Sequence, residues 1–581
     1  MGKKITIEPV TRVEGHGKVT IRLDDAGRVT QSRFHIVEFR GFERFVQGRP
    51  YWEAPVLVQR LCGICPVSHH LAAAKAMDVV VGAGPGKIPA TAEKMRRLMH
   101  YGQMLQSHAL HFFHLSSPDF LLGMDADPAV RNVIGIIGLD KELATQAVLL
   151  RKFGQEVILA TAGKKIHGTG AVPGGINKNL SPEERDRFLK GPEPLTIDRM
   201  IEWSQAAVAL FKDYQRKNKD VVDGFAAFPS NHLSLVRKDG ALDFYHGVLR
   251  AVDAEGRKVL DDVDYADYLE HIGEETRAWS YMKFPYLRSL GKADGWYRVG
   301  PLARLNTCDY VPSPLAQKEF EAYKAYTDGK PNNMSLHTHW ARLIELLHSA
   351  EVIKELLLDK DLQGDRLVKT GKRVPEGVGL VEAPRGTLFH HYRVADDDRI
   401  TMANLIVSTT NNNEPMNRAV HWVAMNVLSE KPEITEGMLN RVEVAIRAYD
   451  PCLSCATHAV GRMPLDVSLV DDGTSCIVFG QAQSDGIEQR ACFRHGSRYD
   501  LQHDVERFEE TIPLCRAMIE KWPTTVGYRV SLLRACFRAR RPAELQAALD
   551  AAHAWFHEGG RWSEDVAASL ASICRETKLH E

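Results

Sequence analysis

Alternating apolar and polar positions predict strands at the start of the chain. Val19, Ile21 and Leu23 alternate with polar neighbours, and after a turn at residues 24–27 the alternation resumes at residues 34–36. A period of two places successive side chains on opposite faces of a strand. The beginning of the chain is therefore predicted to form a β-hairpin or a small sheet.

Near residue 91 the period changes to that of a helix. Apolar or small side chains recur from Met95 to Phe112 at intervals of three and four, which places them on one helix face. Thr91 is the candidate cap of this helix, and Pro118 is its candidate end. The same pattern predicts further helices at residues 197–217, 338–359 and 416–428. We therefore expect a mainly α protein with a small N-terminal β region, in the α+β class.

The composition shifts after about residue 484. From there to the end the chain is rich in Ala, Arg and Glu and is expected to be helical. Its helices are expected at residues 505–520, 527–539, 542–557 and 563–576. Two such helix hairpins resemble a tetratricopeptide unit weakly, and a generic helical appendage is the alternative.

Charge and hydropathy exclude several classes of protein. The 581 residues contain 74 Lys and Arg against 75 Asp and Glu, and this balance indicates no nucleic-acid partner. No apolar run reaches the roughly 18 residues of a membrane span, and no secretory signal is recognisable. A cytoplasmic protein is expected, in which the ten cysteines stay reduced and are free for metal or redox chemistry.

Two C-x-x-C pairs lie far apart in the chain. They are Cys62 with Cys65, and Cys452 with Cys455, and 452 − 65 = 387 positions separate them. Thiolates suit Ni, Fe, Cu(I) or Zn, and Pro66 predicts a helix start that would favour the thiolate form of the first pair. The pairs of a zinc ribbon usually lie within about 20 residues of each other. A thioredoxin-like redox pair would explain only one of the two motifs.

The sequence around these pairs resembles a known family. Over about residues 4–480 the chain is similar to the large subunits of nickel–iron hydrogenases. The matching segments are residues 12–17 (RVEGHG), 39–43 (FRGFE), 60–69 (RLCGICPVSH), 382–386 (EAPRG) and 450–458 (DPCLSCATH). Residues 387–393 (TLFHHYR) are most similar to the cytoplasmic, bidirectional, NAD-linked subgroup. The resemblance implies the hydrogenase large-subunit fold, in which a helical bundle buries the metal site.

The resemblance assigns a ligand role to each cysteine of the two pairs. Cys62 and Cys452 would be terminal nickel ligands. Cys65 and Cys455 would bridge nickel to an iron that also carries CO and cyanide. Soft thiolate ligation suits the redox chemistry of nickel.

Four further residues match cofactor or metal positions of the family. Thr409 lies where the family hydrogen-bonds a cyanide ligand, and Pro384 belongs to the EAPRG motif and is assigned to cofactor binding. Glu43 and His458 match the ligands of a magnesium ion near the cluster, although His is an unusual partner for so hard a cation.

Heterolytic cleavage of H2 requires a hydride acceptor and a proton acceptor close together. The resemblance offers two proton acceptors: Cys452, which could pass a proton to Glu14, or the guanidine of Arg385. Because Arg is normally always protonated, Arg385 could instead donate hydrogen bonds or orient Asp119 and Asp450. The sequence leaves this choice open.

The remaining cysteines form no iron–sulfur spacing, so electrons would have to leave through a partner. The resemblance implies an iron–sulfur small subunit and diaphorase subunits that carry flavin and bind NAD. NADP or a deazaflavin is the alternative carrier. A non-catalytic H2 sensor and an unprocessed precursor are the alternatives to an enzyme.

The family also implies proteolytic maturation. Nickel-insertion proteins load the site, and an endopeptidase then cuts after the residue that corresponds to His458. The expected organisation is a catalytic domain at residues 1–458, a pro-tail at 459–484 and a helical extension at 485–581. The family's usual tail is short, whereas 581 − 458 = 123 residues follow here.

Overall fold

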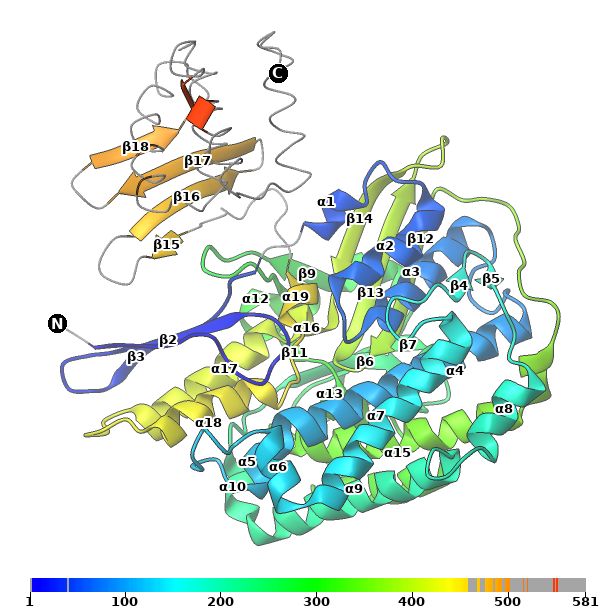
Figure 1. The fold of residues 1–581 in the computed structure, drawn as a ribbon, viewed down its shortest axis with the longest axis horizontal. Coiled ribbons are helices and arrows are strands. Elements are labelled where there is room, and N and C mark those ends of the chain that lie inside the picture. Colours follow the sequence, from blue (N-terminus) through cyan, green and yellow to red (C-terminus); the bar gives the residue numbers. More distant parts are fainter. Residues whose placement is uncertain are drawn as a thin grey trace. The chain divides into compact units, whose positions relative to one another are not determined.

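A computed structural model describes residues 3–38 and 41–457, strands between residues 468 and 501, and six helical positions at residues 516, 520, 547, 548, 550 and 551 (Figure 1). His458 and the helices expected at 527–539 and 563–576 lie outside the described residues. The chain divides into two compact units, residues 1–460 and 461–581. Among the described helices, none combines the length and the apolar character of a membrane span.

The predicted N-terminal β region is a three-stranded antiparallel sheet. Its strands are β1 (Lys4–Ile7), β2 (Gly17–Leu23) and β3 (Val29–Ile36), in the spatial order β1-β2-β3. The alternating apolar side chains, such as Val19 and Phe34, are fully buried. This part of the fold is confirmed.

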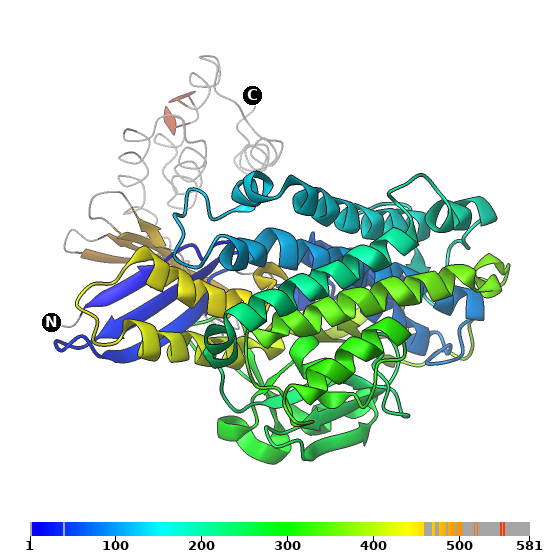
Figure 2. The ribbon, with the colours of Figure 1, turned by 90° about the horizontal axis from the view of Figure 1, so that it is seen from below.

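Long helices form the body of the first unit (Figure 2). Helix α4 (Ala90–Ala109) packs against α7 (Lys141–Ala162) and α15 (His337–Leu358), and α15 packs against α9 (Ile197–Lys217). The helices predicted near residues 197–217 and 338–359 are confirmed. The one predicted at 416–428 is α17 (Asn413–Val423), which continues as a π-helical turn to Leu428.

Both predicted ends of the helix near residue 91 were wrong. Pro89 occupies the N-cap position of α4, so Thr91 lies inside the first turn. At the other end, the chain continues through a π-helical segment (Leu110–Ser116) into α5 (Ser117–Leu121). Pro118 lies in the first turn of α5, a position where proline is tolerated.

Besides two small two-stranded sheets, the middle of the chain contains two larger sheets that the sequence patterns did not predict. One has the order β11 (Tyr297–Arg298), β6 (Asn231–Val236), β7 (Val248–Val252) and β8 (Lys258–Val263). The other is β12 (Glu376–Ala383), β13 (Gly386–Val394) and β14 (Ile400–Ile406), all antiparallel. Strands β12 and β13 are buried on both faces, so they show no polar–apolar alternation.

Helix α3 (Pro66–Val80) lies directly on the β12–β13 hairpin. A Cβ atom added to Gly379 would lie 2.1 Å from the carbonyl oxygen of Ala72, and one added to Gly377 would lie 2.2 Å from that of Ala76. Only glycine permits this approach of helix to strand. The contact brings the first turn of α3, which follows Cys65, close to the end of the hairpin.

In the second unit, the described strands are β15 (Ser468–Val470), β16 (Cys476–Gln483), β17 (Gly486–Phe493) and β18 (Ser497–Leu501), paired antiparallel in chain order. The expectation that the chain is helical from residue 485 is therefore wrong for β17 and β18. The helical expectation came from the composition of residues 485–581 taken as a whole, and a composition over so long a segment does not reveal two short strands at its start. The six described helical positions all lie within the expected helices 505–520 and 542–557.

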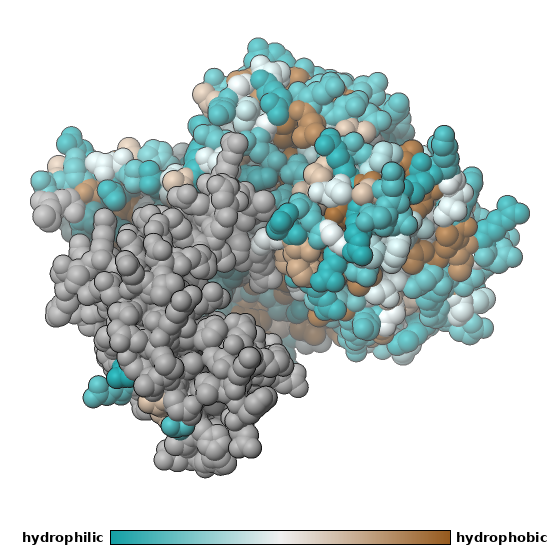
Figure 3. All heavy atoms as spheres, turned by 90° about the horizontal axis from the view of Figure 1, so that it is seen from above, coloured by the Kyte–Doolittle hydropathy of each residue, from teal (hydrophilic) through white to brown (hydrophobic). Residues whose placement is uncertain are grey.

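On the face of the molecule in Figure 3, the described surface is largely hydrophilic, with apolar residues gathered in smaller patches.

Candidate metal centre

The four cysteines of the two pairs meet in the core of the first unit. The Sγ atom of Cys62 lies 3.0 Å from that of Cys452, and the Sγ atom of Cys65 lies 4.0 Å from those of Cys452 and Cys455. All four sulfurs lie within 4.8 Å of one another, and all four residues are buried. Within the part of the chain that the structure describes, this is the one group of three or more His, Cys, Asp or Glu arranged to hold a metal ion.

Backbone N–H groups and a helix start surround the first pair. Cys62 ends a short 3-10 helix, and the N–H groups of Ile64 and Cys65 donate to its Sγ atom over 3.2 and 3.3 Å. Cys65 occupies the N-cap position of α3. Donated hydrogen bonds and a helix N-terminus both favour the negatively charged form of a thiol.

Contacts with distant segments hold the second pair. The backbone N–H of Cys452 donates to Oγ1 of Thr409 over 3.0 Å. The N–H of Ser454 donates to a carboxylate oxygen of Glu14 over 3.1 Å, and Glu14 forms a β-bridge with Cys452. Gly15 has a φ of +81°, and an added Cβ would lie 2.8 Å from the backbone nitrogen of Ser454. The RVEGHG motif therefore holds the loop that carries Cys452.

The cluster can give up protons to a cation. Hydrogen bonding with Cys452 and Cys455 lowers the pKa of Cys65 well below its usual range. Burial raises the pKa of Cys452 and of Cys455 well above it. A bound metal ion would displace the protons that such thiols carry. Four converging soft donors fit a soft, redox-active metal such as nickel.

Arg385 lies on the two-residue turn between β12 and β13, where Ala383 pairs with Gly386. Its guanidinium donates to Oδ1 of Asp450 over 3.0 Å and to Oγ of Ser107 over 3.4 Å. Burial alone would lower the pKa of Arg385, but the charge of Asp450 and the nearby cysteines outweigh it and raise that pKa well above its usual range.

Asp450 is held in an uncommon conformation next to the cysteine loop. Its φ is +53°, and Oδ2 of its carboxylate has no hydrogen-bond partner among the described residues. Burial raises the pKa of Asp450 to about 6, although Arg385 and Arg342 act in the opposite direction.

Asp119 has hydrogen-bond partners other than Arg385. Its carboxylate binds Arg12 over 2.6 and 3.0 Å and Arg447 over 2.5 Å, and it accepts a hydrogen bond from Asn440. Among the described hydrogen bonds none joins it to Arg385, because Arg12 and Arg447 occupy both of its oxygens. Of the two predicted partners, Asp450 alone contacts Arg385.

Glu43 lies buried on α1 (Phe42–Phe45). One of its carboxylate oxygens accepts the backbone N–H of Leu405 over 2.8 Å, and the Nζ atom of Lys283 lies 3.9 Å from the same oxygen. The other predicted magnesium ligand, His458, lies outside the described residues.

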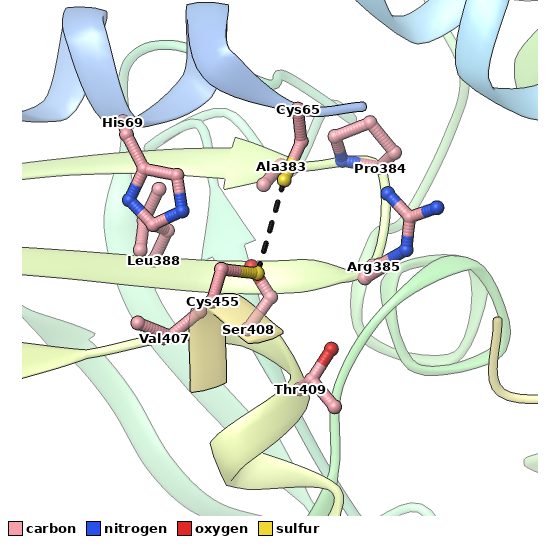
Figure 4. Close-up of a pocket in the computed structure, with 10 residues that line it drawn as sticks. All are labelled: Cys65, His69, Ala383, Pro384, Arg385, Leu388, Val407, Ser408, Thr409 and Cys455. Atoms are coloured by element: carbon pink, nitrogen blue, oxygen red, sulfur yellow. Dashed lines mark hydrogen bonds between the residues drawn. The ribbon is translucent and has the colours of Figure 1, made fainter. Parts of the chain in front are cut away.

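A small cavity adjoins the sulfur cluster (Figure 4). The sulfurs of Cys65 and Cys455 face each other across it, and Pro384, Arg385 and Thr409 lie around it. It is also lined by His69, Ala383, Leu388, Val407 and Ser408. The sequence analysis did not single out His69, although it ends the RLCGICPVSH motif.

Comparison with known proteins agrees with this site. A family model described as nickel-dependent hydrogenase matches residues 40–132 and 219–458, and a HoxL-like model matches residues 4–39. Together these ranges span well over half of the chain. The chain therefore belongs to the nickel-dependent hydrogenase family, as its five motifs indicated.

Within that family the chain is a nickel–iron hydrogenase large subunit. It is 55% identical to the beta subunit of the NAD-reducing hydrogenase HoxS of Cupriavidus necator, over 81% of this chain and 98% of that protein. It is 44% identical to one subunit of the F420-non-reducing hydrogenase of Methanothermobacter thermautotrophicus, over 79% and 95% of the two chains. The crystal structure of an NAD+-reducing [NiFe]-hydrogenase in the H2-reduced state matches with a TM-score of 0.75 and 55% identity, over 78% and 99% of the two chains.

Proposed function

We propose that this subunit cleaves H2 reversibly and passes the electrons through an iron–sulfur small subunit and a flavin-containing diaphorase to NAD. The observation that carries the proposal is the convergence of four buried cysteine sulfurs within 4.8 Å. The chain is similar to a subunit of an NAD-reducing hydrogenase over 98% of that subunit's length. This similarity supports NAD as the electron acceptor. Since NAD is a coenzyme of the cytoplasm, that is the proposed location.

The cysteines would divide the metal ligation as the resemblance implies. Cys62 and Cys452 would be terminal nickel ligands, and Cys65 and Cys455 would bridge to an iron that carries CO and cyanide. When bound, such a centre supplies the soft, redox-active Lewis acid that accepts the electron pair of H2.

We propose Glu14, and not Arg385, as the proton acceptor. Arg385 is buried in an ion pair with Asp450, and its raised pKa keeps it charged. It would therefore donate hydrogen bonds into the cavity and act as an electrostatic stabiliser. The backbone of Glu14 pairs with that of Cys452, and the Glu14 carboxylate accepts a hydrogen bond from Ser454 in the same loop. The Glu14 carboxylate would therefore lie near a proton that the Cys452 sulfur releases.

The other site residues would support the metal centre. Pro384 and Thr409 line the cavity and would contact the diatomic ligands of the iron. Asp450 would orient Arg385 through its hydrogen bond. Asp119 would have an indirect role, by holding Arg12 in place. Glu43 and His458 would bind magnesium. For Glu43, a buried carboxylate beside the backbone of Leu405 supports this role.

Maturation would follow the family pattern. Residues 1–458 would form the catalytic domain, 459–484 a removable pro-tail and 485–581 an extension. Nickel-insertion proteins and an endopeptidase that cuts after His458 would be the partners. The end of the family match at residue 458 supports this boundary.

The test is intact mass and metal content of the chain purified with its partners from its own cells, together with H2-dependent reduction of NAD. Equal nickel and iron, a mass ending at His458 and NADH formation are expected. A full-length chain that carries zinc, or no metal, would overturn the proposal.

A further inference from the structure

Three buried side chains form a hydrogen-bonded row that ends at the sulfur cluster. Nδ1 of His69 lies 3.1 Å from Nε2 of His390, and Nδ1 of His390 lies 2.7 Å from the hydroxyl of Tyr392. Their exposed fractions are 1% for His69 and 0% for both His390 and Tyr392. The row is therefore shielded from water.

The fold brings the row together from two elements. His390 and Tyr392 are two residues apart on β13, so they share a face of the strand, and His69 is the fourth residue of α3. The glycines of β12 allow α3 to lie against this face, because Gly379 pairs with His390 and Gly377 pairs with Tyr392. In Figure 4, His69 stands beside the cavity that holds the sulfurs of Cys65 and Cys455.

The chemistry of the groups fixes the direction of the hydrogen bonds. Burial raises the pKa of Tyr392 well above its usual range, so the phenol keeps its proton. Burial lowers the pKa of His390 well below its usual range, so this imidazole is neutral, with one donor and one acceptor nitrogen. Among the described residues, His390 is the one hydrogen-bond partner of the Tyr392 hydroxyl. The hydroxyl therefore donates to Nδ1 of His390.

The remaining protons follow in turn. Since Nδ1 of His390 accepts, its proton sits on Nε2, which donates to Nδ1 of His69. His69 then carries its proton on Nε2, the nitrogen that no other described hydrogen bond uses. His69 and the sulfurs of Cys65 and Cys455 line the same small cavity. If instead Nδ1 of His390 donated to Tyr392, the hydroxyl hydrogen of Tyr392 would be buried without an acceptor. The proton of His69 would then sit on Nδ1, and its Nε2 would turn a lone pair toward the sulfurs.

We propose that Tyr392 and His390 are positioning residues that set the tautomer of His69, so that it presents an N–H to the bridging thiolate of Cys65. This inference rests on the proposed function, because it assigns Cys65 to the metal centre. An N–H donated to a ligating thiolate withdraws electron density from the metal and raises its reduction potential. Tyr392 would thus tune the centre without touching it.

The strand supplies a matched control on its other face. The hydroxyl of Tyr268 lies 3.1 Å from Nδ1 of His391, the neighbour of His390 on β13. Tyr268 is also fully buried. Tyr268→Phe therefore removes a buried tyrosine–histidine hydrogen bond on the other face of β13, together with the bond that the Tyr268 hydroxyl accepts from Asn404.

The experiment compares the wild-type complex with Tyr392→Phe and Tyr268→Phe by redox titration of the nickel spectroscopic signal, with nickel content measured in parallel. Tyr392→Phe is expected to keep its nickel, to shift the potential to a more negative value and to lower kcat about tenfold with little change in KM. Tyr268→Phe is expected to leave the potential unchanged. Equal potentials in Tyr392→Phe and wild type, or equal shifts in both variants, would overturn the proposal.

A second pair of variants tests the order of donors. In His390→Gln an amide can still accept from Tyr392 and donate to His69, so the wild-type potential should be retained. His390→Leu removes both bonds and should reproduce the negative shift. A shift in His390→Gln as large as that in His390→Leu would contradict the assignment. A wild-type complex without nickel would overturn the proposed function and this inference with it, whereas a nickel-loaded, active complex with unshifted variants would overturn this inference alone.

Discussion

The guanidinium of Arg385 donates to Oδ1 of Asp450 over 3.0 Å, with both side chains almost completely buried. The pair joins the tip of the β12–β13 hairpin to the residue two positions before Cys452. It thus fixes a positive charge beside the metal centre.

Arg385→Lys should keep the charge but lose the planar, multiply donating head group. We expect kcat for H2 oxidation to fall by about two orders of magnitude, the range for loss of a preorganised donor, with nickel content unchanged. The control is Arg257→Lys, since Arg257 pairs with Asp253 and is 77% exposed. Equal rates in the two variants would exclude an active-site role for Arg385.

Cysteine variants should separate ligands from structural thiols. Cys62→Ser replaces a soft donor in the cluster and should abolish stable nickel binding. Cys308 is equally buried but lies outside the cluster, and burial raises the pKa of its thiol to about 12. Cys308→Ser should therefore retain nickel in metal analysis. Nickel loss in both variants would point to misfolding as the cause.

Gly379→Ala should push α3 away from the sheet, because the new Cβ would meet the Ala72 carbonyl at 2.1 Å. Overpacking of this kind costs on the order of 3 kcal/mol of unfolding free energy. Nickel content should fall too, since α3 starts next to Cys65. Gly224→Ala is the control, because its added Cβ has nothing within 4 Å. Thermal unfolding that affects both variants equally would refute the close-approach argument.

Lys75 should make stability depend on pH. Burial lowers its pKa from 10.5 to about 7, partly offset by Asp243 and Asp78. Between these two values the unfolded chain binds more protons than the folded one, so the free energy of unfolding rises with pH in that window. The rise from this residue is at most about 1.4 kcal/mol per pH unit.

Lys75→Met should lose that rise in denaturant unfolding between pH 7 and pH 10, whereas Lys258→Met should keep it, since Lys258 is 47% exposed in its side chain. Parallel stability curves for wild type and Lys75→Met would show that Lys75 does not titrate in this range.

The sequence was sufficient to predict the cysteine cluster and the main helices. Cys62 and Cys452 could be paired because each stands in a recognisable motif. Of the two carboxylates expected beside Arg385, the structure has one in contact with it. Asp450 forms a hydrogen bond with Arg385, whereas Asp119 binds Arg12 and Arg447. Which carboxylate pairs with which arginine depends on how the helices pack, and the pattern of residues in one sequence does not reveal that packing.

Strands β12 and β13 were missed for a related reason. They carry Glu382, Thr387, His390 and His391 at fully buried positions, where each is satisfied by a specific partner. Hydropathy patterns treat such residues as surface. The π-helical continuation of α4 toward Pro118 likewise has no signal in a period of 3.6.

The distance between the two cysteine pairs along the chain has a consequence for biosynthesis. Because 387 positions separate Cys65 from Cys452, a ribosome must translate nearly the whole catalytic domain before the second half of the cluster exists. A nascent or prematurely terminated polypeptide that lacks residues 452–455 can offer nickel only two of the four cluster thiols. The arrangement therefore acts as a quality check, in which only completed molecules can acquire the full metal centre.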